Sequence, residues 1–538
     1  MRNDFGTAIR PKSLFKTVVR VIIVDETATF AQGGFNLKYT STRSKIKPIN
    51  SAEAILRGLS DDGGLFVPEK IPKVTLDEIG ALQTLSYEQR AAKILGKFLT
   101  DYTDDELGEC SELAYNFFDV PARIPVAILI QDPKNPIAPV GEMELFHGPT
   151  SAFKDVALQM LPHLMRMALK KVGETKEILI LVATSGDTGK AALAGFADVP
   201  QTKVMVFYPD GGVSKIQRLQ MVTQRGANVN VTAVRGNFDD CQNGVKKIFG
   251  DAKIRDELDK LGVKLSSANS INWGRLVPQI VYYFAGYVEL IKSNQIKLGD
   301  KINISVPTGN FGNILAAYYA MRMGLPVRKL ICASNMNDVL TEFFRTGVYN
   351  RNRPFHKTIT PSMDILISSN LERLLYHETN GDIKQVARYM SELNTLGKYK
   401  IDRKLKERLD KIFHAEAVTE DETRDYIKRI YDSFKYVLDT HSAVAVAALS
   451  KYRGKTKDFA PVLSAGTASP YKFTNAVLTA LGQQVDGVDD LKQLHMLNVT
   501  TNLPVPKNLG ALSTAEILHG DVCDKDEMPE RVIKFAAK

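Results

Sequence analysis

The nine residues HGPTSAFKD, from His147 to Asp155, combine a Gly-Pro turn, two hydroxyls, an aromatic ring and a lysine. They follow an apolar run that is typical of a strand and ends near Phe146. After them, DVALQMLPHLMRMALKK has the apolar spacing of an amphipathic helix, which Pro162 interrupts early. Lys154 is therefore predicted at the start of a helix, shortly after a strand.

A lysine at this position has two interpretations. Most lysines are solvated surface charges, and the chain has 70 basic residues. A buried lysine instead has a lowered pKa, and its neutral amine can form a Schiff base with a carbonyl cofactor. Phe153 can shield the amine, and the hydroxyls of Thr150 and Ser151 can hold a cofactor or substrate oxygen. The local sequence thus shifts the balance towards the second interpretation and leaves both open.

The composition is that of a globular protein with more than one domain. At 538 residues and 59.6 kDa, the chain is too long for a single core, so two or three domains are expected. No apolar run approaches 18 residues, which predicts no membrane span. The four cysteines are far apart and form no CxxC pair, which argues against a disulfide framework or a zinc site and fits a reducing compartment.

The net charge of +9 is concentrated near the N-terminus. Residues 1–50 hold nine basic and three acidic residues, so two thirds of the excess lies there. The nearly neutral remainder does not predict a nucleic-acid surface. VVRVIIV at residues 18–24 is too short and too charged for a membrane helix, and no small-residue cleavage site follows it. A mitochondrial presequence stays open for residues 1–37, although a non-essential extension is the preferred hypothesis.

The pattern changes near residue 125. Before it, four segments place apolar residues at helical spacing, and Thr75, Ser86 and Thr103 are predicted N-caps. After it, short β-branched runs alternate with helical segments, which predicts a parallel sheet covered on both faces. The runs are VAILIQ, EILILVAT, KVMVFYP, NVNVTAV, KINISVP, KLICAS and FAPVLSAG. A charged helical insert at about 380–435 has no recognisable motif and is interpreted as solvated packing.

Ligands of parallel sheets bind at the carboxyl ends of the strands, where TSGDTG, TGNFGN and GTASP occur. In VPTGNFGN, residues 306–313, a strand ends and a helix begins; converging backbone N–H groups and the helix dipole suit a phosphate. A tight turn without a ligand explains this motif alone equally well.

ATSGDTGKAAL, residues 183–193, resembles a Walker A loop only superficially. Thr184 stands where its first glycine belongs and Ala191 replaces its Ser/Thr, so a nucleoside triphosphate site is disfavoured. Its hydroxyls and N–H groups at a helix start suit a carboxylate instead.

SANSINWGRL, residues 267–276, offers a guanidinium, amides and a hydroxyl that suit a phosphate, with a surface salt bridge as the alternative. Lone histidines are expected to pack or cap rather than catalyse. His441 in THSAVAVAAL is one of them, and His147 is of only moderate interest.

Together these motifs resemble the threonine synthase family, which belongs to the fold type II, tryptophan-synthase-β-like superfamily of pyridoxal-phosphate enzymes. HGPTSAFKD looks like its cofactor-lysine segment. The resemblance extends from about Tyr39 towards the C-terminus, through LKYTSTRS, GLSDDGGLFVP, ATSGDTGKAAL, SANSINWGRL, VPTGNFGN and LSAGTASPYKF. It implies an α/β fold with two open, mostly parallel sheet subdomains, helices on both faces of each sheet, and a mostly helical N-terminal domain. The expected divisions are an extension at 1–37, the helical domain at 38–125, the catalytic region at 126–510 with the active site between its subdomains, and a C-terminal tail at 511–538.

The resemblance also implies residue roles. Lys154 is expected to carry pyridoxal 5'-phosphate as the catalytic lysine, and a hydroxyl at Thr467 to meet the pyridine nitrogen and leave it largely unprotonated. Further cofactor contacts are expected from Phe153, Asp187, Gly309, Asn310, Phe311, Gly312 and Asn313. Substrate contacts are expected from Thr184, Ser185, Gly186, Thr188, Ser270, Asn272 and Arg275, with the last three at the substrate phosphate. No metal is expected.

The activity implied is that of a carbon–oxygen lyase acting on phosphate. It converts O-phospho-L-homoserine and water to L-threonine and phosphate by γ-elimination and β-addition of water, the last step of threonine biosynthesis. The Lys154 amine is the expected proton shuttle between Cα, Cβ and Cγ. A cytoplasmic monomer or homodimer without nucleic-acid or membrane partners is expected.

Three rival functions remain, of which a nucleotide-binding protein is disfavoured by the incomplete Walker A pattern. A serine/threonine dehydratase would share the lysine and the glycine loop but would need no second phosphate site. A non-enzymatic homologue that binds phosphorylated metabolites would be expected to lack Lys154, which is present.

Overall fold

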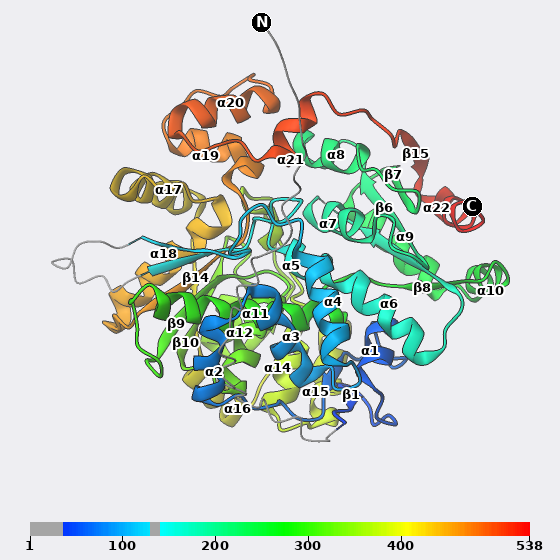
Figure 1. Ribbon diagram of the computed structural model, residues 1–538, viewed down its shortest axis with the longest axis horizontal. Helices are drawn as coiled ribbons and strands as arrows, with labels where there is room; N and C mark the ends of the chain where they lie inside the picture. Colours follow the sequence, from blue (N-terminus) through cyan, green and yellow to red (C-terminus); the bar gives the residue numbers. More distant parts are fainter. Residues whose placement is uncertain (1–35, 130–139, 185) are drawn as a thin grey trace, which may run out of the picture.

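The computed structural model describes residues 36–129, 140–184 and 186–538, and its strands form two main sheets (Figure 1). The smaller sheet has five parallel strands in the order β15-β7-β6-β5-β8. These strands are β5 Glu177–Ala183, β6 Thr202–Pro209, β7 Val229–Arg235, β8 Val263–Ser266 and β15 Asp521–Asp524.

The larger sheet has six strands in the order β13-β10-β9-β14-β4-β3. Its strands are β3 Val126–Ile128, β4 Val140–Glu144, β9 Ile302–Pro307, β10 Val327–Ser334, β13 Phe413–Ala417 and β14 Val462–Gly466. All pairs are parallel except β3 with β4. The six residues of β9 are all buried, as expected for a strand covered by helices on both faces. The α/β fold predicted from the sequence is thus confirmed.

Helices pack on both sheets. The smaller sheet is contacted by α7 Asp187–Phe196, α9 Phe238–Gly250 and α10 Ala252–Lys260, and the larger by α12 Gly312–Met323, α13 Val339–Thr346 and α18 Thr440–Thr456. The other helices after residue 186 are α8 Lys215–Val222, α11 Trp273–Lys292, α14 Leu371–Glu378, α15 Ile383–Leu396, α16 Arg403–Ile412, α17 Glu420–Phe434, α19 Thr474–Ala480, α20 Asp490–Thr501, α21 Lys507–Gly510 and α22 Met528–Ala536. No helix of the described ranges is long and apolar enough to cross a membrane.

The N-terminal part is helical, as predicted. After a short antiparallel pair, β1 Tyr39–Ser41 with β2 Phe66–Pro68, it contains α1 Ser51–Arg57, α2 Leu76–Ala81, α3 Tyr87–Phe98 and α4 Asp104–Tyr115. Thr75, Ser86 and Thr103 each cap their helix in a reciprocal capping box, which confirms the predicted N-caps. α3 packs on the buried helix α11, where Trp273 contacts the rings of Tyr39 and Phe98.

The helix that follows the lysine motif is divided in two. A single residue, Gln159, separates α5 Lys154–Leu158 from α6 Met160–Val172. The proline ring at 162 would clash with the carbonyl of Leu158 in a continuous helix, which explains a break before the proline rather than at it. Pro162 itself lies in the first turn of α6, where a missing N–H costs little.

Two segments have more structure than the sequence indicated. The insert at 380–435 contains α15, β12 Lys398–Lys400, α16, β13 and α17; β12 pairs with β11 Val348–Asn350. β13 forms an edge of the larger sheet. Residues 511–538 include β15 and α22, both of which pack against the smaller sheet or its helices. The division of the chain into domains stays a prediction.

Candidate active site

The lysine segment is attached to the end of β14. Phe153 N donates to Thr467 O at 2.8 Å, and Ala152 forms an isolated bridge with Ala468. Lys154, the first residue of α5, therefore lies beside the carboxyl end of a central strand of the larger sheet. Ligands of parallel sheets bind at such strand ends.

The Lys154 amine is enclosed, since only 14% of the side chain is exposed. Its Nζ lies 3.3 Å from Ser362 Oγ, 3.8 Å from Asp187 Oδ2 and 5.5 Å from the centre of the Phe153 ring. Burial lowers the pKa of Lys154; the Asp187 carboxylate opposes this, and Lys472 reinforces it. The amine is consequently neutral more often than that of an exposed lysine, which is what a nucleophile or a base requires.

Asp187 and Lys472 form an ion pair behind the amine. The Oδ1 and Nζ atoms are 2.8 Å apart, with 5% and 0% of the side chains exposed. Lys472 Nζ also donates to Thr150 O at 3.0 Å and Gln220 Oε1 at 3.1 Å. Burial alone would raise the pKa of Asp187, but the charges of Lys472 and Lys154 hold it well below its usual range. The carboxylate is thus ionised beside the Lys154 amine.

The hydroxyls of the lysine motif have partners within the protein. Thr150 donates to Asp155 through its N, at 2.8 Å, and its Oγ1, at 2.6 Å. Ser151 Oγ pairs with Asn508. A Cβ at Gly148 would lie 2.4 Å from Asp155 Cβ, so only glycine fits this turn. These contacts shape the segment, and the idea that the hydroxyls hold a ligand oxygen stays a hypothesis.

The glycine loop between β9 and α12 forms a tight cradle. A Cβ at Gly309 would lie 2.5 Å from Ser362 O, so the backbones of the two loops approach closely. Phe311, the N-cap of α12, has φ 65° and no capping side-chain bond, which leaves the first N–H groups of that helix available. The Phe311 side chain points into the core against Phe344 and Phe413, so its contribution to the loop is through the backbone.

Asn313 and Asn310 differ in their surroundings. Asn313 is buried, its Oδ1 accepts from Tyr283 OH, and its Nδ2 has no partner in the described part of the chain. Asn310 is exposed, and its carbonyl accepts from Asn370 N at 3.1 Å and Asn370 Nδ2 at 3.0 Å. A buried amide with an unused donor suits an acceptor ligand.

The loop after β5 is shaped by its own hydroxyl. Thr184 Oγ1 accepts from Gly186 N at 3.0 Å and Gly189 N at 3.1 Å. Gly186 has φ 148°, and a Cβ there would lie 2.3 Å from Gln217 Nε2. Thr188 is half-buried in the first turn of α7, and Ser185 lies outside the described residues. The substrate contacts predicted for this loop stay predictions.

Arg275 is a buried cation with few partners. Four per cent of the residue is exposed; Nη1 donates to Ala268 O, and Nε has no partner in the described ranges. Burial lowers its pKa to about 9. A buried guanidinium with unused donors suits an anion, which could accept hydrogen bonds and share the charge.

The other two residues of this segment have different settings. Asn272, the N-cap of α11, uses its side chain on Ile55 O, Ser267 O and Gly274 N. Ser270 Oγ accepts from Asn370 Nδ2 at 3.3 Å. Because Asn370 also contacts Asn310, the segment that carries Arg275 adjoins the glycine loop.

Three residues near the site were not identified from the sequence. Ser362 lies in a short 3₁₀ turn at Pro361–Met363, where no motif indicated a role. Lys472 lies two residues after GTASP, within LSAGTASPYKF, so its closeness to that motif was a usable signal. Asn370 joins the glycine loop to Ser270 across about 100 residues of sequence, a contact that spacing cannot predict.

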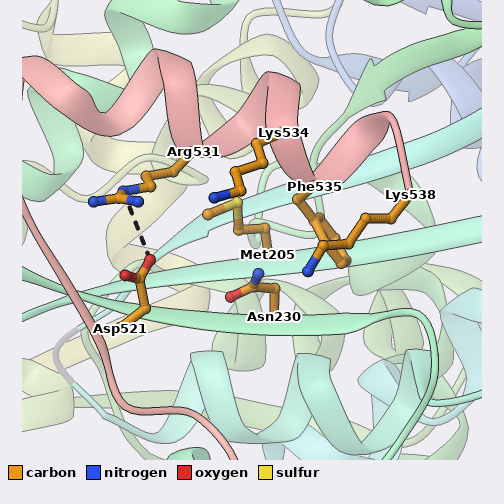
Figure 2. A pocket seen from close by; sticks show the side chains of 7 residues that line it. All are labelled: Met205, Asn230, Asp521, Arg531, Lys534, Phe535 and Lys538. Atoms are coloured by element: carbon orange, nitrogen blue, oxygen red, sulfur yellow. Dashed lines mark ion pairs between the residues drawn. The ribbon is translucent and has the colours of Figure 1, made fainter.

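A separate pocket lies away from this site. It has a volume of about 180 Å³ and is lined by Met205, Asn230, Asp521, Arg531, Lys534, Phe535 and Lys538 (Figure 2). These side chains come from β6, β7, β15 and the region of α22. The described residues contain no cluster of metal-ligating side chains, and their four cysteines are buried and free.

The chain is similar to known proteins along most of its length. A family model described as pyridoxal-phosphate dependent enzyme matches residues 142–392. Models of the threonine synthase N terminus and of the threonine synthase C-terminal part match residues 38–115 and 442–517. The fold and the enclosed lysine thus define a member of the pyridoxal-phosphate-dependent enzymes.

Individual relatives show to which family of these enzymes the chain belongs. Threonine synthase of Saccharomyces cerevisiae is 39% identical over 467 residues, 82% of this chain and 89% of the relative. Human threonine synthase-like 1 is also 39% identical, over 84% of this chain, but the matched region spans only 61% of the human protein. The X-ray structure of PLP-bound threonine synthase from Brucella melitensis is 35% identical with a TM-score of 0.82, over 93% of this chain and all of that one. The chain belongs to the threonine synthase family.

Proposed function

We propose that the protein is a threonine synthase, a carbon–oxygen lyase that converts O-phospho-L-homoserine and water to L-threonine and phosphate with pyridoxal 5'-phosphate as cofactor. The observation that carries the proposal is the pairing of an enclosed lysine with two separate anion-binding settings. One is the glycine loop at residues 309–313, and the other is the buried guanidinium of Arg275. A phosphorylated cofactor and a phosphorylated substrate together require two such settings.

The residues present fit the cofactor. The uncapped start of α12 and the unused Asn313 amide suit its phosphate, and Lys154 suits its aldehyde. Thr467, which is buried at the end of β14, is the proposed partner of the pyridine nitrogen. A hydroxyl there leaves that nitrogen largely unprotonated. When bound, pyridoxal phosphate supplies an electron sink for the carbons of the attached amino acid.

The protein groups have to bind, orient and transfer protons. The Lys154 amine is the base that takes protons from substrate Cα and Cβ, which lets the phosphate leave Cγ, and the acid that supplies protons at Cγ and, after water has added at Cβ, at Cα. Arg275 holds the substrate phosphate and so places the Cγ–O bond that breaks. The loop Thr184–Thr188 is the proposed site of the substrate carboxylate. Enclosure of the amine limits water at the site to the molecule that adds at Cβ.

A serine/threonine dehydratase is the second candidate, since it would use the same lysine and glycine loop. Arg275 argues against it. A substrate without phosphate would leave this buried cation without a counter-ion, at a cost in free energy that a dehydratase has no reason to bear.

A direct assay separates the two candidates. Purified protein loaded with pyridoxal phosphate should release phosphate from O-phospho-L-homoserine, with L-threonine as the co-product. Lys154→Ala should abolish turnover, and borohydride should fix the cofactor on Lys154 of the wild type only. Release of 2-oxobutanoate from threonine without phosphohomoserine turnover would favour the dehydratase.

We further propose that the protein works in the cytoplasm as a monomer or homodimer with a small-molecule substrate and no nucleic-acid or membrane partner. Four buried, unpaired cysteines support a reducing compartment. Size-exclusion chromatography with light scattering tests the oligomeric state.

A further inference from the structure

Ser362, Asp439 and His441 lie together directly behind the Lys154 amine. His441 and Asp439 are almost fully buried, at 2% and 1% exposed, and Ser362 is half-buried. His441 Nδ1 lies 3.1 Å from Asp439 Oδ1, and its Nε2 lies 3.2 Å from Ser362 N. Ser362 Oγ then lies 3.3 Å from Lys154 Nζ.

The contacts fix the state of the imidazole. A backbone N–H can only donate, so His441 Nε2 must accept and carries no proton. The ring proton is therefore on Nδ1, where it is donated to Asp439. A proton on Nε2 would face the Ser362 N–H, which is itself a hydrogen-bond donor.

The same contacts exclude a nucleophilic serine. A hydrolase triad has the same three residue types, but its imidazole faces the serine Oγ in order to take that proton. Here Nε2 faces the serine backbone, and the Oγ faces an amine. The arrangement holds a serine in place instead of activating it.

Asp439 is also linked, through Ser442, to the segment that carries Thr467. As the N-cap of α18 it accepts from the N–H groups of His441 and Ser442, and Ser442 Oγ donates to it. Ser442 Oγ in turn accepts from Thr467 N at 3.3 Å. One buried carboxylate thus orders both the turn that carries Ser362 and the start of the Thr467 segment.

We propose that Ser362 is a further residue of the reaction site, and that His441 and Asp439 are positioning residues that hold its hydroxyl against the Lys154 amine. The inference rests on the proposed function in that Lys154 is taken as the reacting group. The hydroxyl accepts a hydrogen bond from the protonated amine and directs it, and so determines where Lys154 carries its proton. The charged groups that also act on this amine are Asp187, Lys472, Arg275 and Asp155.

Substitution of His441 by each of the two amide residues distinguishes a role in positioning Ser362 from a role in packing alone. Glutamine places an oxygen near the position of Nε2, so His441→Gln should keep an acceptor for Ser362 N. Asparagine is one methylene shorter and keeps only a donor for Asp439, so His441→Asn should release Ser362. Asp402→Asn, an N-cap exchange in α16, serves as the matched control.

The measurement is the pH midpoint of Lys154 acylation, followed by mass spectrometry on the full chain after removal of cofactor. Loss of the hydroxyl acceptor disfavours the charged amine, so Ser362→Ala should lower this midpoint by about one unit. His441→Asn should lower it in the same direction, whereas His441→Gln and Asp402→Asn should stay near the wild type. Loaded Ser362→Ala and His441→Asn should also lose kcat with KM little changed.

The outcomes distinguish this inference from the proposed function. Unchanged midpoints in Ser362→Ala and His441→Asn, or equal midpoints for the two His441 variants, would overturn the inference. Thermal unfolding of each variant checks that the fold is intact, and Ser362→Ala tests the hydroxyl even if a His441 variant unfolds. A wild type that neither fixes the cofactor on Lys154 nor turns over phosphohomoserine would refute the proposed function alone, because acylation is measured without cofactor.

Discussion

The ion pair of Asp187 with Lys472 places two opposite charges where almost no water reaches them. Such a pair adds little stability relative to apolar residues, but removal of one partner leaves the other charge buried and uncompensated. Asp187 begins α7, which packs on the smaller sheet, and Lys472 lies in the turn that follows β14 of the larger sheet. The pair thus couples the two halves of the site.

Lys472→Met should consequently lower the free energy of unfolding, by at most about 3–5 kcal/mol, because the Lys154 amine 3.8 Å from Asp187 Oδ2 still offsets part of the carboxylate charge. The double variant Lys472→Met with Asp187→Asn should recover part of this loss, because the buried carboxylate charge is then removed as well. Denaturant titration at pH 7 measures both. A single variant as stable as the wild type would mean that Asp187 is neutralised in another way.

Arg275→Ala should leave cofactor binding intact and raise the KM for O-phospho-L-homoserine at least about tenfold, the equivalent of one hydrogen bond to a charged group. Arg275→Lys should restore affinity only in part, because a point charge cannot reproduce a two-pronged contact. Steady-state kinetics and inhibition by inorganic phosphate check this. Normal kinetics in Arg275→Ala would assign the substrate phosphate to other residues.

At the scale of elements, the junction of β9 with α12 offers two glycines in contrasting surroundings. A Cβ at Gly309 meets the backbone oxygen of Ser362 at 2.5 Å, whereas one at Gly312 meets only side-chain nitrogens at 3.6 Å or beyond. At Gly309 the Ser362 backbone leaves no room for a side chain, whether or not a ligand is bound. At Gly312 the protein leaves room for a methyl group, which would lie where the cofactor phosphate is proposed to bind.

Gly312→Ala should therefore fold with a Tm close to that of the wild type but retain pyridoxal phosphate less tightly. Gly309→Ala should lower the Tm with or without added cofactor. Differential scanning fluorimetry and equilibrium dialysis measure the two properties. Equal cofactor affinity in Gly312→Ala and wild type would place the phosphate elsewhere.

His147 connects β4 to the segment that follows α4. Its Nε2 is 2.8 Å from Glu144 Oε2 and its Nδ1 is 2.9 Å from Asp119 Oδ1. Burial alone would lower the pKa of His147, but the two carboxylates outweigh this and raise it. Both ring nitrogens can donate only when the imidazole is charged.

This raised pKa makes part of the stability depend on pH. The contacts of charged His147 with the two carboxylates stabilise the fold fully below the unfolded-state pKa of about 6.5. This stabilisation is lost as the pH rises through the higher folded-state pKa. The loss should be roughly 1 kcal/mol, since Asp119 is exposed. Denaturant titrations from pH 5 to 9 should show this decline in the wild type and not in His147→Gln.

Across the chain, local sequence patterns predicted which segments form strands and helices better than they predicted which of these pack together. The segments that form β5, β6, β7, β9, β10 and β14 are rich in β-branched residues. The capping boxes at Thr75, Ser86 and Thr103 each depend on four consecutive residues, so the local sequence is enough to predict them. β8, β13 and β15 were not predicted, because their short, partly polar sequences become strands only through a neighbour in the sheet.

The same limit applies to the site. Lys154 and the glycine loop stand in contiguous motifs, so the sequence was enough to propose them. Ser362, His441 and Asp439 are brought together from three segments, and each has an ordinary local environment. His441 was expected to pack or cap, and only its Nε2 contact with Ser362 N distinguishes it from such a residue.

The small sheet is also completed late in time. A ribosome makes β7 and then about 285 more residues, 236–520, before it reaches β15, the strand that covers the free edge of β7. At about 5–20 residues per second this edge waits roughly 15–60 s, exposed to pairing with other chains. Removal of residues 521–538 would make that interval permanent. We expect the shortened chain to accumulate in inclusion bodies or bound to chaperones, which fractionation of expressing cells would show.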